Sequence, residues 1–178
     1  MNDGILSRYW KSYGGLKALL KSYYFYASII ISLLLAPHWL YSEWWNHVLS
    51  IMPSVLGFSL GGYAMWIALG DENFRKLISG TTQDGKASPF MSVNAAFVHF
   101  IMLQIVAIIF ALFADAYNFQ LSENSLILTT FGKYFFYICK LGAFLGYFVF
   151  IYALLSAMAA TLALLRVSSW YDAFMNKK

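Results

Sequence analysis

The chain has 178 residues, of which 61% are apolar and only 11% are charged, and its mean hydropathy is +0.63. A soluble domain has about a quarter charged residues and could not hide so many apolar side chains in its own core, so the composition predicts an integral membrane protein. The net charge of +4 is spread over the ends of apolar runs, which fits membrane topology better than nucleic-acid binding. Because Cys139 is the sole cysteine, an intrachain disulfide, a cysteine-based metal cluster and a thiol relay are excluded.

Residues 1–22 are mixed in character. Apolar side chains recur at helical spacing, and basic side chains stand between them. This pattern is typical of a basic amphipathic helix lying on anionic lipid, while an ordinary cytoplasmic lead-in that supplies positive charge fits it about as well. We expect Gly14 and Gly15 to break or bend the segment.

The first apolar run, residues 23–41, follows a basic segment and therefore competes with a signal peptide. The basic segment is too long for one, and no small-residue cleavage site follows Leu35, so an uncleaved anchor helix is predicted. Residues 42–50 are interpreted as a short loop at an aromatic belt of tryptophans, Trp39, Trp44 and Trp45. His38, Glu43 and His47 do not share one helical face, so we predict no metal site there.

The second span is predicted over residues 51–70, within PSVLGFSLGGYAMWIALGDENFRKLI. Its eighteen residues from Pro53 carry no charge, which is long enough for a membrane helix. Gly57 and Gly61 stand four apart on one face, with Ala64 and Ala68 on an adjoining one. Such small residues let a second helix approach closely in lipid, so they are predicted to mediate helix packing and oligomerisation.

A polar loop, residues 71–89, follows this span and opens with a cluster of charges. The cluster contains Asp71, Glu72, Arg75 and Lys76, with Asp71 and Arg75 at the i,i+4 spacing that favours an ion pair on a short helix. We predict that these four residues form a cytoplasmic surface for a partner.

The third span, residues 90–114, carries three polar side chains inside an apolar run: Asn94, His99 and Gln104. Polar groups there are costly unless they face protein or water. Their five-residue spacing spreads them around the helix instead of lining one pore. For His99 a hydrogen bond between helices is the favoured interpretation, and a pH-sensing or ion-path residue is the alternative.

The fourth span is predicted over residues 134–165, after a second loop at 115–132. Its length exceeds one perpendicular crossing, so Lys133 and Lys140 are expected to reach outer headgroups. Gly142 and Gly146 repeat the four-residue spacing and are predicted to pack or oligomerise.

The basic residues set the orientation. If both termini are cytoplasmic, ten of the twelve lie inside and only Lys133 and Lys140 lie outside. The predicted fold is therefore an all-α polytopic protein whose four transmembrane helices occupy residues 23–167, followed by a cytoplasmic tail over 168–178.

Gly57-Phe58-Ser59-Leu60-Gly61 matches the G-x-S-x-G nucleophile elbow and resembles a lipase fragment. That chemistry needs a strand and a strained turn, whereas the motif sits in an apolar helix. No phosphate-binding glycine loop or H-E-x-x-H motif is present, and the acids all lie at helix ends or in loops. We predict no enzyme activity and no cofactor.

Two functions remain. The first is a membrane subunit that forms a homo-oligomer and passes a signal to a cytosolic protein. The second is a pore-forming effector or channel, for which the polar candidates are sparse and unaligned although hydrophobic gating would still permit one. A lipid hydrolase based on Ser59 is the least favoured.

The segment PSVLGFSLGGYAMWIALGDENFRKLI, with its glycine-rich helix and charged end, resembles small four-helix membrane proteins of bacterial anti-phage loci, of the type of the membrane subunit of the Kiwa system. The resemblance covers about a seventh of the chain and includes no catalytic signature. It implies an inner-membrane location and a role as the sensor or anchor of a soluble partner.

Overall fold

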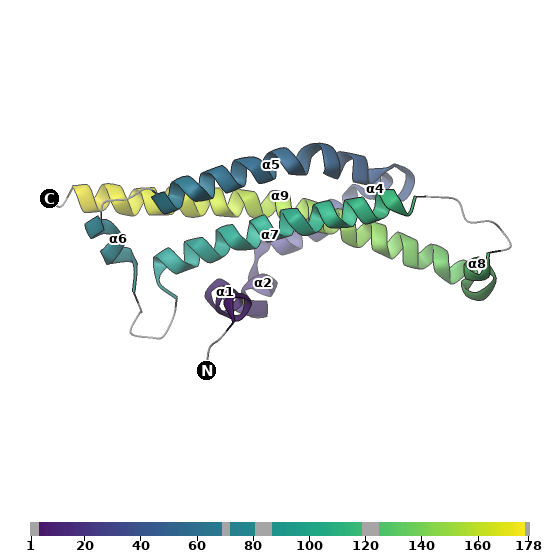
Figure 1. The fold of residues 1–178 in the computed structure, drawn as a ribbon, viewed down its shortest axis with the longest axis horizontal. Helices are drawn as coiled ribbons and strands as arrows, with labels where there is room; N and C mark the ends of the chain where they lie inside the picture. Colours follow the sequence, from purple (N-terminus) through teal and green to yellow (C-terminus); the bar gives the residue numbers. More distant parts are fainter. Residues whose placement is uncertain (1–3, 69–71, 81–86, 119–124, 177–178) are drawn as a thin grey trace.

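The computed structural model describes residues 4–68, 72–80, 87–118 and 125–176 (Figure 1). Within these ranges the regular structure is entirely helical, in agreement with the predicted all-α class. The helices are α1 (Ile5–Tyr13), α2 (Gly15–Lys21), α3 (Tyr23–Leu34), α4 (Ala36–Tyr41), α5 (Trp44–Ala68), α6 (Glu72–Ile78), α7 (Pro89–Ala116), α8 (Leu126–Phe131) and α9 (Lys133–Met175).

Three long helices, α5, α7 and α9, lie side by side along the long axis of the molecule (Figure 1). Each is long and apolar enough to cross a membrane. Helices α5 and α9 run in the same direction and α7 runs in the opposite one. The prediction of long apolar helices is confirmed for these elements, and α7 begins and ends within two residues of the predicted third span.

The first predicted span is two short helices instead of one. Helix α3 ends at Leu34 and α4 begins at Ala36, with Leu35 between them. Pro37 explains the break, because proline has no N–H and its ring collides with the carbonyl four residues earlier, so it is tolerated only in the first turn of a helix. The 12 residues of α3 rise about 18 Å, less than the roughly 30 Å of a hydrocarbon core.

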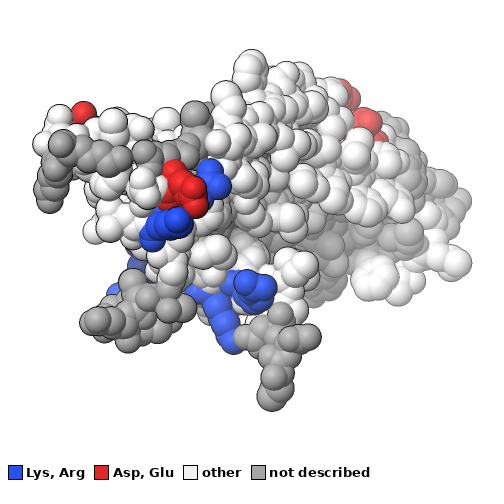
Figure 2. Space-filling view, turned by 60° about the vertical axis from the view of Figure 1, so that its left-hand side comes forward, with Lys and Arg blue, Asp and Glu red and all other residues white. Residues whose placement is uncertain are grey.

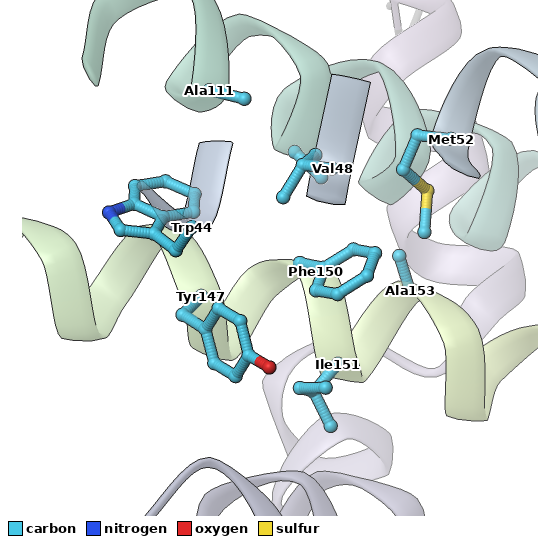
Figure 3. Close-up of a cluster of buried hydrophobic side chains, with 9 residues drawn as sticks. Trp44, Val48, Met52, Ala111, Tyr147, Phe150, Ile151 and Ala153 are labelled. Carbon is cyan, nitrogen blue, oxygen red and sulfur yellow. The ribbon is translucent and has the colours of Figure 1, made fainter. Parts of the chain in front are cut away.

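Helix α5 begins at Trp44, so the predicted loop over residues 42–50 is wrong for all but its first two positions. Trp44, Val48 and Met52 stand four apart and are 3%, 0% and 0% exposed. We call these three residues the inner stripe of α5. They pack against α7 and α9 in the main core (Figure 3), with Ala107, Ala111, Tyr147, Phe150, Ile151 and Ala153. Burial of this stripe, and not solvent contact in an aromatic belt, sets the start of the helix.

Helix α9 is 43 residues long and continues through most of the segment predicted as a cytoplasmic tail, residues 168–178. At 1.5 Å per residue it extends about 64 Å, roughly twice a hydrocarbon core. Near its C-terminal end, Phe74 of α6 packs on Tyr171 and Phe174, with ring centroids 5.1 Å and 5.7 Å away. The end of the bundle that carries α6 is therefore a folded unit.

The N-terminal segment is helical with the predicted break. Gly14 and Gly15 have φ values of +101° and +64°, in the left-handed region that favours glycine, and they separate α1 from α2. Helix α1 packs on α7 and crosses the bundle instead of running along it (Figure 1).

Candidate functional site

A cluster of three tyrosines around His99 connects α1, α7 and α9. The Tyr9 hydroxyl lies 2.6 Å from His99 Nδ1, and the Tyr152 hydroxyl lies 3.2 Å from His99 Nε2. The Tyr13 ring stacks on the imidazole with centroids 4.0 Å apart, and its hydroxyl is 3.4 Å from that of Tyr152. Because His99 is only 7% exposed, the protein itself supplies the partners of its ring nitrogens.

The cluster is chemically complete for a neutral imidazole. One ring nitrogen of neutral histidine donates a hydrogen bond and the other accepts one. Either tyrosine can therefore donate while the other accepts, so the network has two equivalent directions. A polar side chain buried among apolar helices is tolerated when its partners are satisfied in this way.

The position of Tyr9 on α1 follows from helical spacing. Tyr9 and Tyr13 stand four apart, so both face the bundle, while Ile5 and Leu6 are 84% and 71% exposed. Burial of Tyr9, and to a lesser extent the nearby Tyr13, raises the pKa of its phenol to about 12. The Tyr9 hydroxyl therefore keeps its proton throughout the physiological range.

The other two polar residues of α7 bind a different helix. The Trp66 indole N–H donates to Asn94 Oδ1 at 2.9 Å, and Gln104 Nε2 donates to Ser59 Oγ at 3.0 Å. Asn94 and Gln104 thus bind α5, whereas His99 binds α1 and α9. His99 therefore points to a different side of α7 from Asn94 and Gln104, and it is hydrogen-bonded between helices.

The G-x-S-x-G motif lies in the middle of α5, with no strand or strained turn at the serine. The Ser59 hydroxyl donates to the Val55 carbonyl and accepts from Gln104. Its role in this arrangement is to accept a hydrogen bond from the buried amide N–H of Gln104, which is 0% exposed. The Oε1 atom of Gln104 has no partner among the described residues.

The two predicted glycine pairs have different surroundings. Gly57, Gly61, Ala64 and Ala68 are exposed along one side of α5, and we call them the open face of α5. Added Cβ atoms at Gly57 and Gly61 would meet nothing within 4 Å. Gly142 is similarly open, but a Cβ at Gly146 would collide with the indole of Trp44. Gly146 is therefore a packing residue within the chain.

The charged cluster lies on α6, except for Asp71, which is outside the described residues together with its predicted pairing to Arg75. Lys76 and Glu72 form an ion pair of 3.0 Å at the i,i+4 spacing. Arg75 donates to the carbonyl of Ile67 at 3.1 Å. Phe74 and Ile78 are buried, so α6 presents its charges outward.

Sequence reasoning found His99 but missed all three of its tyrosine partners. Tyr9 and Tyr13 stand four apart and so share a helix face, but this spacing does not reveal that the face packs on α7. The ring centroids of His38 and His47 lie 5.7 Å apart, and no three potential metal-ligand side chains gather among the described residues.

Comparison with known proteins adds no assignment. No family model, curated protein or solved structure matches this chain.

Proposed function

We propose that this chain is a non-enzymatic membrane subunit that oligomerises through α5 and anchors a cytosolic partner through α6. In this proposal α3 and α4 together form a bent fourth crossing, and both termini lie in the cytoplasm of a bacterial cell, at the inner membrane. The resemblance of residues 53–78 to membrane proteins of anti-phage loci favours a role as a sensor in such a defence.

The observation that carries the proposal is the open face of α5. A run of small residues on a membrane helix allows close approach of another helix, and within the described chain no side chain fills the space at Gly57 or Gly61. Large apolar neighbours flank it: Phe58 is 85% exposed and Met65 is 62% exposed. A second copy of α5 would pack against this face with glycines at the centre.

The folded end of the bundle favours the part of the proposal that concerns a cytosolic partner. The buried Phe74 and Ile78 hold helix α6 in place, so the backbone that carries its charged residues has a fixed position. Figure 2 shows a mixed patch of acidic and basic side chains at this end and a separate group of basic side chains below it. A fixed pattern of both charges gives specificity toward a protein more readily than a mobile loop does.

The oligomer is tested by mass measurement in mild detergent. Gly57→Leu and Gly61→Leu, made together, should shift the purified protein toward the monomer. Thr161→Leu, at an exposed position of α9, is the matched control and should leave the mass unchanged. An unchanged oligomer in the double glycine variant would refute the α5 interface.

The partner is tested by purification from the native host followed by mass spectrometry. We expect a cytosolic protein in fixed ratio, and its loss in the charge-exchange variant Glu72→Lys with Lys76→Glu. This exchange preserves an intrahelical ion pair, so loss of the partner would report on the surface and not on unfolding of α6. A homo-oligomer alone that conducts ions in liposomes would replace this proposal with the pore.

A further inference from the structure

A cleft of about 180 Å³ lies between α1, α5 and α7, next to the His99 cluster, with which it shares Tyr9. Its walls are mostly apolar, with Ile5, Tyr63, Met91, Ala95 and Val98 among the lining residues. Tyr9 closes one side, so the packing of α1 on α7 creates the cleft.

The cleft has one charged lining residue, Arg8. The Arg8 side chain is exposed and forms no ion pair with a described residue. From residue 4 to residue 42 the chain contains Arg8, Lys11, Lys17 and Lys21 but no aspartate or glutamate. The local charge is therefore positive at the mouth of an apolar cavity.

We propose that this cleft binds an anionic phospholipid of the surrounding bilayer, with the phosphate on Arg8 and part of one acyl chain between α1 and α7. A guanidinium pairs with phosphate through two parallel hydrogen bonds, which a zwitterionic lipid reaches less favourably because its own ammonium competes. The apolar walls match a hydrocarbon chain and offer little to a free anion.

The surroundings of α1 support a lipid as the occupant. Leu6 is 71% exposed, and Ile5, which also lines the cleft, is 84% exposed, as expected for a helix whose apolar side lies in the headgroup region. Helix α1 meets α7 at His99, ten residues from its start at Pro89, or about 15 Å along the axis. Lipid that contacts Ile5 is thus already beside the cleft. This lipid site goes beyond the proposed function and does not depend on oligomerisation.

Native mass spectrometry of the full-length protein in mild detergent tests the site with dioleoyl phosphatidylglycerol and dioleoyl phosphatidylcholine as probes. We expect about tenfold greater retention of phosphatidylglycerol, and about a tenfold loss of that retention in Arg8→Gln, which removes one charge-assisted contact. Met91→Trp, which fills the apolar part of the cleft, should reduce retention of both lipids.

Lys17→Gln is the matched control, because it removes a charge from the same basic segment outside the cleft lining. It should change retention by less than about twofold, since a distant exposed charge contributes little. Equal loss in Lys17→Gln and Arg8→Gln would overturn the site in favour of a diffuse basic surface. Equal retention of the two lipids would also overturn it.

Glycerol 3-phosphate separates the lipid from its headgroup. If the acyl chain is part of the ligand, millimolar glycerol 3-phosphate should not displace phosphatidylglycerol. Displacement would overturn the acyl-chain part of the proposal and leave an anion site. Circular dichroism and elution volume check the folding of each variant, and Met91→Trp tests the cleft independently of Arg8.

Discussion

Helix α5 has two surfaces built on the same four-residue spacing, and they have opposite environments. Its inner stripe is Trp44, Val48 and Met52, and these side chains are enclosed by α7 and α9. Its open face carries Gly57 and Gly61, with empty space beside them. The difference teaches that spacing alone identifies a helix face but not the neighbour that covers it.

Gly146 shows what decides the outcome. It belongs to a glycine pair like that of α5, yet Trp44 occupies the space beside it, whereas Gly142 one turn earlier has none of this contact. The space beside a glycine is filled by the chain itself when a large side chain of a neighbouring helix lies opposite. An open glycine is available to another molecule.

The largest expected effect is in the inner stripe. Met52→Ala should destabilise the protein by about 2–5 kcal/mol, because it leaves a cavity at a fully buried position. Thermal unfolding in mild detergent, followed by circular dichroism, measures this change. Met65→Ala, at an exposed position of the same helix, should stay within about 0.5 kcal/mol, and equal effects would contradict the distinction between the two surfaces.

Gly146→Ala should cost about 1–3 kcal/mol, because its methyl group would displace the Trp44 indole from a packed core. Gly142→Ala adds the same methyl group into open space and should be neutral or slightly stabilising, since alanine favours a helix more than glycine does. The same unfolding measurement compares them. If the two variants were equally stable, the contact of Gly146 with Trp44 would not constrain the fold.

His99→Leu should destabilise by about 1–3 kcal/mol, because it deprives the Tyr9 and Tyr152 hydroxyls of a hydrogen-bond partner. Helix α1 depends on this contact, so hydrogen exchange of residues 5–13 should accelerate more than that of α5. His99→Gln keeps a donor and an acceptor and should recover part of the protection. Unchanged exchange in His99→Leu would show that α1 is held by other contacts.

The smallest expected effect is at α6. Lys76→Ala removes an exposed ion pair and should change stability by less than about 0.5 kcal/mol. Chemical or thermal unfolding should therefore be unaltered, while recovery of the cytosolic partner falls. A large loss of stability would mean that the pair holds α6 in place and is not simply a surface feature.

Hydropathy was sufficient to place α7 and the membrane part of α9, because long uncharged runs leave few alternatives to a helix. It misplaced the start of α5, since tryptophans near a membrane boundary have two roles and only the packing of Trp44 on Gly146 and Tyr147 distinguishes them. Pro37 is a sequence signal for the break at Leu35, but the apolar run continues through it and favoured a single helix.

The candidate site, too, could be predicted only in part from the sequence. The sequence identified His99 as a buried polar residue and indicated that its neighbours on α7 face elsewhere. It could not pair Tyr9 with His99, because 90 residues separate them along the chain and the contact exists only once α1 crosses α7. Long-range pairs of this kind depend on tertiary packing and leave no local pattern.

The length of α9 has a mechanical consequence. A continuous helix of 43 residues is about 64 Å long, and its middle packs in the main core around Phe150. Rotation of this helix about the packed segment moves its two ends in opposite directions, by on the order of 5 Å each for a tilt of about 10°. Helix α6 packs near one end of α9, on Tyr171 and Phe174, and so would move together with that end.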